Sequence, residues 1–431
     1  MKAVMISAPN SNSGKTIVCA ALLRFFKING FNISGFKTGP DQVDRKILET
    51  VSGKSAGNID IFMMGKQGIR QALSFSNSEY AIIEGAMGCF DGIGTTAENS
   101  SYAIAKELDI NIILVYAPSG EMFTMIPKLK GLLDYSEGRI CGIILNKISP
   151  KIFPFYKKMI EENLSLQVLG FFPNEEKLKI EDSGLGLSLN GKLKDSSFLN
   201  SLDTVVNENI NIDSMLPFFK EIKFQPVHFM KPAARKICTA IASDESVNLY
   251  YAENIFLLTS AGSVKYFSPL NDRKLPPCDF LYFGSGNIRL FAETLSANSE
   301  MRNAVKNFAE SGGFILAEGE SASYLFEQFD GYEMCGIIKG KAESTKMLCN
   351  FGYKCAELKA DCIFGKQGTV LHTAEYHKSK AITNANTIFK ISKPLSEIYF
   401  DDGYVYKNAL AIFQNLNFVS CEAILENLIT R

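Results

Sequence analysis

Residues 7–16 read SAPNSNSGKT and follow the apolar run KAVMI at residues 2–6. A short apolar run is typical of a buried strand, and the segment KTIVCAALLRFFKING (15–30) has a helical pattern. Strand, loop and helix in this order form the context of a phosphate-binding loop of the form G-x-x-x-x-G-K-[ST]. Pro9 stands where that pattern has its first glycine, but the final GKT completes it. The sequence therefore predicts a nucleotide site at the start of the chain.

The residues at the end of this loop have expected roles. Backbone N–H groups of Asn12, Ser13 and Gly14 and the helix N-terminus would hold phosphate oxygens. Lys15 would neutralise the outer phosphates, and the hydroxyl of Thr16 would ligate Mg²⁺. The alternative, a turn rich in Ser and Asn with a chance GKT, is disfavoured by the strand and the helix on either side.

Composition limits what this motif can mean. A chain of 431 residues is too long for one ordinary core, so two domains are expected. The net charge is −1 and no basic block follows a nucleic acid backbone, which excludes nucleic acid as the expected partner. No apolar run approaches the roughly 18 residues of a membrane span. We expect a cytoplasmic protein that acts on small molecules.

The ten cysteines are scattered and include no C-x-x-C pair. This distribution argues against a zinc site and against a disulfide framework. With only three histidines in the chain, a histidine metal centre is not expected either.

Two further stretches carry a family resemblance. ISGFKTGPDQVDRKILETVSGKSAGNIDIFMM (33–64) and YAIIEGAMGCFDG (80–92) resemble the FKxGPDYID, NLD and EGxMGLFDG signatures of the cobyrinic acid a,c-diamide synthases. The loop also resembles that of the related dethiobiotin synthetases, in which the first glycine lies one position earlier than in standard P-loops. Ala8 occupies that place here. The EGAMGCFDG string favours the cobyrinate branch over a dethiobiotin-synthetase-like enzyme with an appended domain.

The resemblance implies that ATP phosphorylates a substrate carboxylate and that ammonia then displaces the phosphate. Phosphoryl transfer depends mainly on positioning and on charge neutralisation. By resemblance, Asp41 and Glu84 join Thr16 as ligands of Mg²⁺, which prefers oxygen donors. Because the run IIE ends a predicted buried strand, Glu84 is expected at the edge of the sheet where sites of parallel sheets lie.

Further residues of these motifs are expected beside the metal or the substrate. Asp44 and Asp91 match acidic catalytic positions, and Lys37 is expected to hold a phosphate or a substrate carboxylate. Gln42 and Val43 occupy a place where the family has Tyr-Ile or Tyr-Leu beside the reacting carboxylate of the macrocycle. For the carboxylates, a solvated loop or a helix cap is the alternative, notably for Asp44 before RKILETV.

The rest of the first domain gives weaker signals. ICGIILNKI (140–148) reads as a buried parallel strand, and Asn146 with Lys147 matches a place where relatives contact adenine. A strand-end turn is the alternative for this pair. The family pattern RHLGL is SGLGL here, so that Ser183 and Gly184 replace an arginine and a histidine.

The second half of the chain repeats the alternation of strands and helical patterns. It resembles the glutamine amidotransferase domain that follows the ATP-dependent domain in this family. We expect a P-loop α/β domain at 1–217, a linker at 218–235 and an α/β domain of the class I amidotransferase type at 236–431. Each is expected to be a three-layer domain with a largely parallel sheet covered by helices.

The glutaminase site departs from the family pattern. The family places a cysteine nucleophile on a sharp turn that reads AECGG, whereas this chain has AEGES with Gly319 at the nucleophile position. Cys335 lies well beyond the turn. His377 matches the partner histidine, for which a packed or surface role is the favoured interpretation. The family's GGGYPE is GSGNIR (284–289), and its HLH is NLN (415–417).

The first hypothesis is therefore an ATP- and Mg²⁺-dependent ligase that amidates the a and c carboxylates of cobyrinic acid. Ammonia, rather than glutamine, would be its direct nitrogen source. The alternatives are a Ni-sirohydrochlorin a,c-diamide synthase and a non-catalytic protein that binds a tetrapyrrole or regulates a partner. A homodimer is compatible with this fold class, and the sequence defines no interface.

Overall fold

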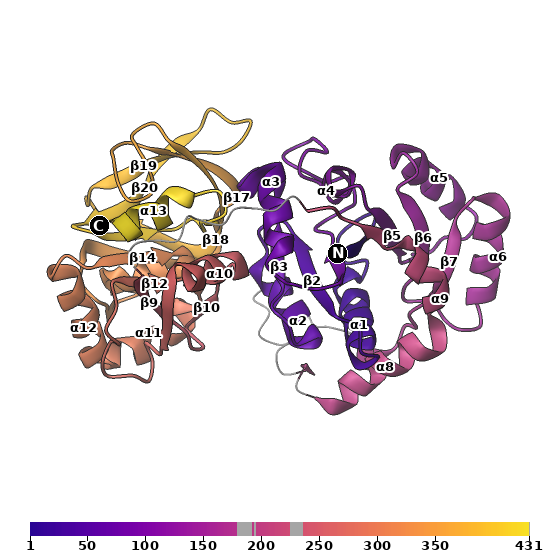
Figure 1. Ribbon diagram of the computed structural model, residues 1–431, viewed down its shortest axis with the longest axis horizontal. Helices are drawn as coiled ribbons and strands as arrows, with labels where there is room; N and C mark the ends of the chain where they lie inside the picture. Colours follow the sequence, from indigo (N-terminus) through magenta and orange to yellow (C-terminus); the bar gives the residue numbers. More distant parts are fainter. Residues whose placement is uncertain (179–191, 194, 225–235, 431) are drawn as a thin grey trace. The chain divides into compact units, whose positions relative to one another are not determined.

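The computed structural model describes residues 1–178, 192–193, 195–224 and 236–430. The chain forms two compact units, Met1–Val227 and His228–Arg431 (Figure 1). Within the described ranges, no helix is long and apolar enough to cross a membrane.

The first unit is built on one sheet. Across the sheet the order is β3-β2-β4-β1-β5-β6-β7, and every neighbouring pair on this path is parallel. The strands of the described residues are β1 (Lys2–Ser7), β2 (Ile33–Thr38), β3 (Gly57–Ile59), β4 (Tyr80–Glu84), β5 (Asn111–Tyr116), β6 (Ile140–Leu145), β7 (Gln167–Phe171) and β8 (Lys220–Glu221).

The opening run of the sequence forms the central strand of this sheet. β1 pairs with β4 on one side and with β5 on the other, and all of its residues except Lys2 are buried. A parallel strand covered on both faces needs apolar residues at successive positions, which explains the uninterrupted run AVMI. The loop that follows β1 therefore leaves the carboxyl edge at the middle of the sheet.

Helices lie on both faces of this sheet, as predicted for a three-layer α/β domain. Figure 1 shows α1, α2 and α8 together, and α1 packs against both of the others. The apolar side chains of α1 and α8 join one hydrophobic core with the sheet. The described helices are α1 (Lys15–Ile28), α2 (Gln42–Ser52), α3 (Ile61–Ser74), α4 (Ser101–Leu108), α5 (Met125–Tyr135), α6 (Phe153–Asn163), α8 (Ser196–Asn209) and α9 (Ile212–Met215), with the 3₁₀ turns η1 (Glu176–Leu178) and η2 (Leu216–Phe218).

The linker expected at 218–235 begins inside the first unit. Phe218 ends η2, and β8 pairs antiparallel with the start of β1. β5 pairs with β1 only from Val4 onward, so Lys2 and Ala3 are available to β8. Residues 225–235 lie outside the described residues, as do Ser183 and Gly184, and the domain boundaries stay a prediction.

The second unit contains a sheet of mixed direction. Its order is β11-β9-β12-β14-β21-β20-β19-β17-β15-β16, with β18 paired to β17. The strands are β9 (Ile237–Ala242), β10 (Val247–Leu249), β11 (Gly262–Phe267), β12 (Phe280–Phe283), β13 (Ser285–Gly286), β14 (Phe314–Glu318), β15 (Phe326–Phe329), β16 (Tyr332–Glu333), β17 (Ile338–Leu358), β18 (Val370–Ile382), β19 (Thr387–Ser392), β20 (Tyr399–Tyr406) and β21 (Ala409–Ile412).

The α/β fold class is confirmed, but the expectation of a largely parallel sheet is wrong for this unit. The pairs from β11 to β21 are parallel, whereas β17, β18, β19 and β20 form antiparallel pairs. Antiparallel strands often keep one face in water, and β17 and β18 accordingly carry many polar residues. The helices of this unit are α10 (Ala252–Ala261), α11 (Ile288–Ala297), α12 (Ser299–Glu310) and α13 (Glu422–Thr430), with the 3₁₀ turn η3 (Gly319–Leu325).

Candidate active site

The loop between β1 and α1 ends on a glycine that the fold requires. Gly14 caps α1 with a φ of 90°, in the left-handed region that favours glycine. A Cβ built at Gly14 would lie 2.0 Å from the side-chain nitrogen of Asn146. Among the described residues, no side chain caps the N-terminus of α1, and the first turn of this helix carries no acidic residue. These are the features of a helix end that binds an anion.

The loop with Pro9 is held by the segment that follows β4. The backbone N–H of Cys89 donates to the carbonyl of Ala8 at 2.7 Å. A Cβ at Gly88 would lie 2.5 Å from the carbonyl oxygen of Pro9, so the two loops are in close contact. Asp91 fixes the second loop, because its Oδ2 accepts the N–H of Gly88 at 2.9 Å. Asp91 thus shapes the site.

Lys15 reaches across both loops. Its Nζ donates to the carbonyl of Asn10 at 3.1 Å and to the carbonyl of Met87 at 2.5 Å. The side chain is largely buried. Burial lowers the pKa of Lys15, and the nearby positive charge of Lys37 lowers it further. An anionic ligand would therefore stabilise the charged form of Lys15.

Four predicted residues form a continuous chain of polar contacts at the carboxyl edge of the sheet. The hydroxyl of Thr16 donates to Glu84 Oε1 at 2.6 Å. Lys37 Nζ donates to the same oxygen at 2.8 Å and to Asp44 Oδ2 at 2.7 Å. Because β1, β2 and β4 are neighbours, the loops and strand ends that carry these residues meet at one edge. The fold brings together four of the predicted site residues, Thr16, Lys37, Asp44 and Glu84. Their roles stay predictions.

Burial and pairing set the charges in this chain of contacts. Burial raises the pKa of the Glu84 carboxyl, and the ammonium of Lys37 opposes that rise. Burial lowers the pKa of Lys37, but the Glu84 and Asp44 carboxylates outweigh it and keep the pKa above its usual value. Burial likewise raises the pKa of Asp44, and the contact with Lys37 outweighs it, so that the pKa is lowered. The ammonium of Lys37 is thus paired with two carboxyl groups, and burial and pairing act on their pKa values in opposite directions.

Asp41, rather than Asp44, is the helix cap in this motif. Asp41 Oδ1 accepts the N–H groups of Val43 at 2.8 Å and of Asp44 at 3.1 Å. Asn58, whose motif carried no expected role, donates to the carbonyls of Gly39 at 2.8 Å and Asp41 at 2.9 Å. The turn that carries Asp41 is therefore fixed from β3 as well as from α2.

The two residues expected beside the substrate differ in exposure. Val43 is partly exposed, whereas Gln42 is fully buried. Among the described residues, neither polar atom of the Gln42 amide has a hydrogen-bond partner. The Gln42 amide therefore lies below the surface in this structure, and its place beside a substrate stays a prediction.

Asn146 contacts the phosphate-binding loop itself. Its Nδ2 donates to the carbonyl of Ser13 at 2.8 Å, and its Oδ1 accepts the N–H of Lys147 at 2.9 Å. Lys147 Nζ donates to the carbonyl of Asn12 at 3.2 Å. The hydroxyl of Ser13 in turn donates to the carbonyl of Asn10 at 3.0 Å. The predicted Asn-Lys pair at the end of β6 therefore clamps the loop, a role that the sequence analysis missed.

The oxygen atoms near Thr16 suit Mg²⁺. Glu84 Oε2 is buried and has no hydrogen-bond partner among the described residues, while Oε1 is shared by Thr16 and Lys37. The described residues contain no cluster of three or more His, Cys, Asp or Glu side chains arranged for a metal ion. Mg²⁺ commonly uses one or two carboxylates together with phosphate oxygens and water, so this sparse donor set fits it.

The second unit keeps the sharp strand-to-helix turn without its nucleophile. Gly319 follows β14 directly and has a φ of 56°. A Cβ at Gly319 would lie 2.2 Å from Ser285 Oγ, 2.8 Å from Ser285 Cβ and 3.3 Å from Asn415 Oδ1. Cys335 is buried, and burial raises its pKa to about 12, which makes it a poor substitute.

His377 is a packed histidine in this structure. Its Nε2 lies 2.8 Å from Glu375 Oε1, and its Nδ1 accepts the N–H of Ser379 at 3.2 Å. Since Nδ1 accepts, Nε2 carries the proton and donates to Glu375. The ring also packs on Phe413 with the ring centroids 4.7 Å apart. Both nitrogens of His377 are thus engaged within the unit.

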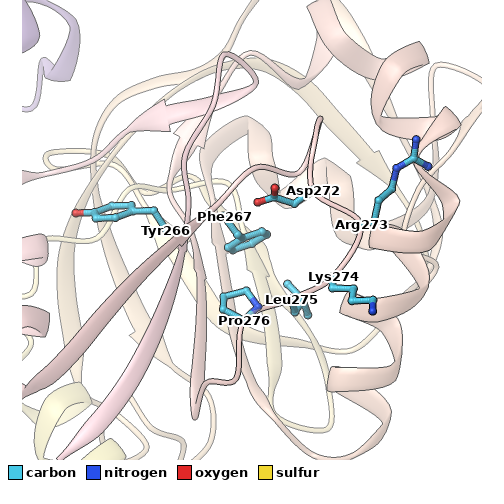
Figure 2. Close-up of a pocket in the computed structure, with 7 residues that line it drawn as sticks. All are labelled: Tyr266, Phe267, Asp272, Arg273, Lys274, Leu275 and Pro276. Atoms are coloured by element: carbon cyan, nitrogen blue, oxygen red, sulfur yellow. The ribbon is translucent and has the colours of Figure 1, made fainter.

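The second unit also has a surface pocket, and its lining residues are distant in sequence from Gly319 and His377. It has a volume of about 510 Å³ and lies along residues 266–276, where β11 ends and the following loop begins (Figure 2). None of the predicted site residues lines it.

Two contacts at the first site come from the backbone. The carbonyls of Asn10 and Met87 hold Lys15, and a carbonyl is the same group in every residue. No sequence signal could have identified them. In the second unit, no sequence signal identified Ser285 either. Its importance follows only from the structure, in which its side chain faces position 319.

Both halves of the chain match known domain families. Residues 4–187 match the CobQ/CobB/MinD/ParA nucleotide binding domain. Residues 239–416 match the CobB/CobQ-like glutamine amidotransferase domain. The protein is therefore of the class that joins a nucleotide-binding domain to an amidotransferase-like domain.

Curated relatives specify the family. The chain is 34% identical to the cobyrinate a,c-diamide synthase of Clostridium acetobutylicum and 31% identical to that of Clostridium tetani, in both cases over 100% of each chain. It is 34% identical to the enzyme of the same name from Fusobacterium nucleatum, over 91% of this chain and 92% of the relative. The chain belongs to the cobyrinate a,c-diamide synthase family, which confirms the resemblance in its motifs.

Proposed function

We propose that this protein is an ATP- and Mg²⁺-dependent ligase that amidates the a and c side-chain carboxylates of cobyrinic acid, with ammonia as the direct nitrogen source. The observation that carries the proposal is the contact chain from Thr16 through Glu84 and Lys37 to Asp44, beside an uncapped helix N-terminus. The names of the relatives support the substrate and the place of the reaction in cobalamin biosynthesis.

The loop and α1 would bind the triphosphate. Backbone N–H groups from Asn12 to Thr16, at the N-terminus of α1, would bind phosphate oxygens, and Lys15 would exchange its carbonyl partners for phosphate oxygens. Thr16, Glu84 and Asp41 would hold Mg²⁺, which neutralises phosphate charge when bound.

Lys37 would position the substrate carboxylate. It lies between Glu84 and Asp44 and carries its charge at neutral pH, so it can offset a further negative group. In the first step, the substrate carboxylate forms a bond to the γ-phosphorus and ADP leaves. In the second step, ammonia forms the C–N bond, the C–O bond to phosphate breaks, and the nitrogen loses a proton. Asp44 would keep Lys37 in place, and Asp91 would keep the loop after β4 in place, during both steps.

Ammonia is proposed as the donor because the turn after β14 carries no nucleophile at position 319. Gly319 stands at the turn where a thiolate would attack glutamine, and His377 is engaged by Glu375 and Ser379. Without a thioester, the second unit has no route to release ammonia from glutamine.

A different macrocycle is the alternative substrate for the same reaction. The family's aromatic residue is replaced by Gln42, and Gln42 is buried. Loss of an aromatic face changes which carboxylate is presented, so Ni-sirohydrochlorin is a substrate to compare with cobyrinic acid.

Incubation with ATP, Mg²⁺, ammonium and each macrocycle, followed by mass spectrometry, tests the proposal. We expect the diamide of cobyrinic acid together with ADP and phosphate. Product from Ni-sirohydrochlorin alone would replace the substrate, and macrocycle binding without ATP turnover would favour a non-catalytic binding protein.

A further inference from the structure

We propose that Ser285 is a second determinant of the nitrogen donor: it occupies the space that a side chain at position 319 would take. The second unit is therefore closed to a cysteine nucleophile, and restoring the cysteine alone does not reopen it. This inference deepens the proposed function, on which it rests for the choice of donor, and it can be tested without any amidation.

The close approach between the two residues is the main observation. A Cβ at Gly319 would meet Ser285 Oγ at 2.2 Å and Ser285 Cβ at 2.8 Å. Rotation of Ser285 about χ1 moves Oγ but leaves Cβ in place, so a change of rotamer does not remove the overlap. Any side chain at 319 then has to displace the backbone of one of the two segments.

The backbone around Ser285 cannot shift easily. β13 pairs antiparallel with β10, with Ser285 opposite Leu249 and Gly286 opposite Val247. A Cβ at Gly286 would lie 2.0 Å from the carbonyl oxygen of Ser246, and one at Gly284 would lie 2.4 Å from the ring of Tyr250. Ser285 is thus bracketed by two glycines that already touch neighbouring atoms, and the segment has no room to retreat.

The other side of position 319 is also filled. Asn415 is fully buried, and its Oδ1 would lie 3.3 Å from the added Cβ. Asn415 Nδ2 donates to the carbonyl of Ala374 at 3.3 Å, and the backbone of Asn415 pairs with Ala374 as well. A side chain at 319 would therefore overlap with Ser285 and would also be in tight contact with the buried amide of Asn415.

The positive φ of Gly319 adds a separate and smaller cost. Any L-residue is strained at a φ of 56°, whatever side chain occupies position 285. This cost is the same in both backgrounds, so a double-mutant cycle separates it from the contact with Ser285.

The experiment measures the melting temperature of six proteins. They are the wild type, Gly319→Ala and Gly319→Cys, each with Ser285 or with Ser285→Gly. Either change at 319 alone should lower the Tm by roughly 5–10 °C, on the scale of 2–4 °C per kcal/mol for domains of this size. Adding Ser285→Gly should recover more than half of that loss, and Ser285→Gly by itself should shift the Tm by less than the recovery.

The cycle has outcomes that overturn the inference. A Gly319→Cys protein as stable as the wild type would show that no space is contested. A double variant no more stable than Gly319→Cys alone would show that Ser285 is not the obstacle. If Gly319→Cys does not fold, recovery of folded protein in the double variant supports the inference, and its absence contradicts it. Amidation from ammonium by the wild type is assayed separately, so a failure of the proposed function is distinguishable.

Discussion

The two units share a local arrangement at the end of one strand, but the residues around it differ. In each unit a strand ends in a buried glutamate, Glu84 at the end of β4 and Glu318 at the end of β14. Glu84 faces the ammonium of Lys37 and the hydroxyl of Thr16. Glu318 receives the hydroxyl of Tyr282 at 3.0 Å and the N–H of Leu416 at 3.2 Å. The first carboxyl group faces a charged partner, whereas the partners described for the second are neutral donors.

Burial beside these neutral partners determines the protonation of Glu318. Burial raises the pKa of Glu318 to about 8, so it is largely protonated at neutral pH. The two units also share a strand-to-helix turn with a left-handed glycine, Gly14 and Gly319. The neutral amide of Asn146 fills the space beside the first glycine, and Ser285 fills the space beside the second. A buried carboxylate or a strained glycine therefore indicates function only when its neighbours are known.

The largest effect is expected from Lys15→Ala. The change removes the ammonium that bridges the carbonyls of Asn10 and Met87 and would bind phosphate. We expect ATP turnover to fall by about 100- to 1000-fold. The control is Lys130→Ala, which removes an exposed lysine of the same unit and should leave turnover unchanged. A Lys15→Ala protein within tenfold of the wild type would contradict the assignment.

Glu84→Gln should have the next largest effect. It removes one of the two carboxylates that hold Lys37, and leaves a buried ammonium half compensated. We expect turnover to fall by about 100-fold and the free energy of unfolding to fall by about 3 kcal/mol. Glu107→Gln is the control, because Glu107 also pairs with two cations but near the surface, where a pair contributes less than about 1 kcal/mol. Equal losses in the two variants would refute the difference between the sites.

Asn146→Ala should weaken nucleotide binding moderately. It removes the hydrogen bond to the carbonyl of Ser13, which is equivalent to about a tenfold loss of affinity. Titration with ATP and with inorganic tripolyphosphate separates two roles. A loss for both ligands indicates that Asn146 positions the loop, and a loss for ATP alone indicates the adenine contact predicted from sequence. Asn163→Ala on α6 is the control, and unchanged binding of both ligands would exclude both roles.

Glu318→Gln should leave amidation unchanged within about twofold and alter only the pH dependence of stability. Because the folded pKa of about 8 exceeds the ordinary value of 4.5, the stability from Glu318 is present below pH 4.5 and is lost as the pH rises through 8. The amide mimics the protonated carboxyl, so the variant should lose this dependence. Unfolding measured from pH 4.5 to 8 checks this, with the exposed Glu293→Gln as control. The same slope in wild type and variant would be the contrary result.

Much of the first unit could be predicted from sequence. The apolar run at 2–6 and the strand before Glu84 are buried on both faces, and such runs are distinctive. The motifs also identified which polar side chains gather at the carboxyl edge. Asp41 caps α2, whereas the helix cap considered as an alternative for these carboxylates is notably Asp44. A motif gives residue types but not which of two carboxylates binds the backbone.

The second unit was predicted less well for a physical reason. β17 and β18 are long antiparallel strands with solvated positions, so their sequences lack an apolar run. The role of Ser285 depends on a contact between segments 34 residues apart, from position 285 to 319, and no local pattern encodes it. Gln42 was assigned to the substrate from its place in a motif, whereas its burial depends on the packing around α2.

The origin of the amide nitrogen tests the central claim most directly. The wild-type protein is incubated with cobyrinic acid, ATP and Mg²⁺ in the presence of unlabelled ammonium and glutamine labelled with nitrogen-15 at its amide. The account predicts a diamide that carries only unlabelled nitrogen and a glutamine pool that stays intact. A diamide that carries the label from glutamine would contradict the account, because it would require a working nucleophile in a unit whose turn bears Gly319.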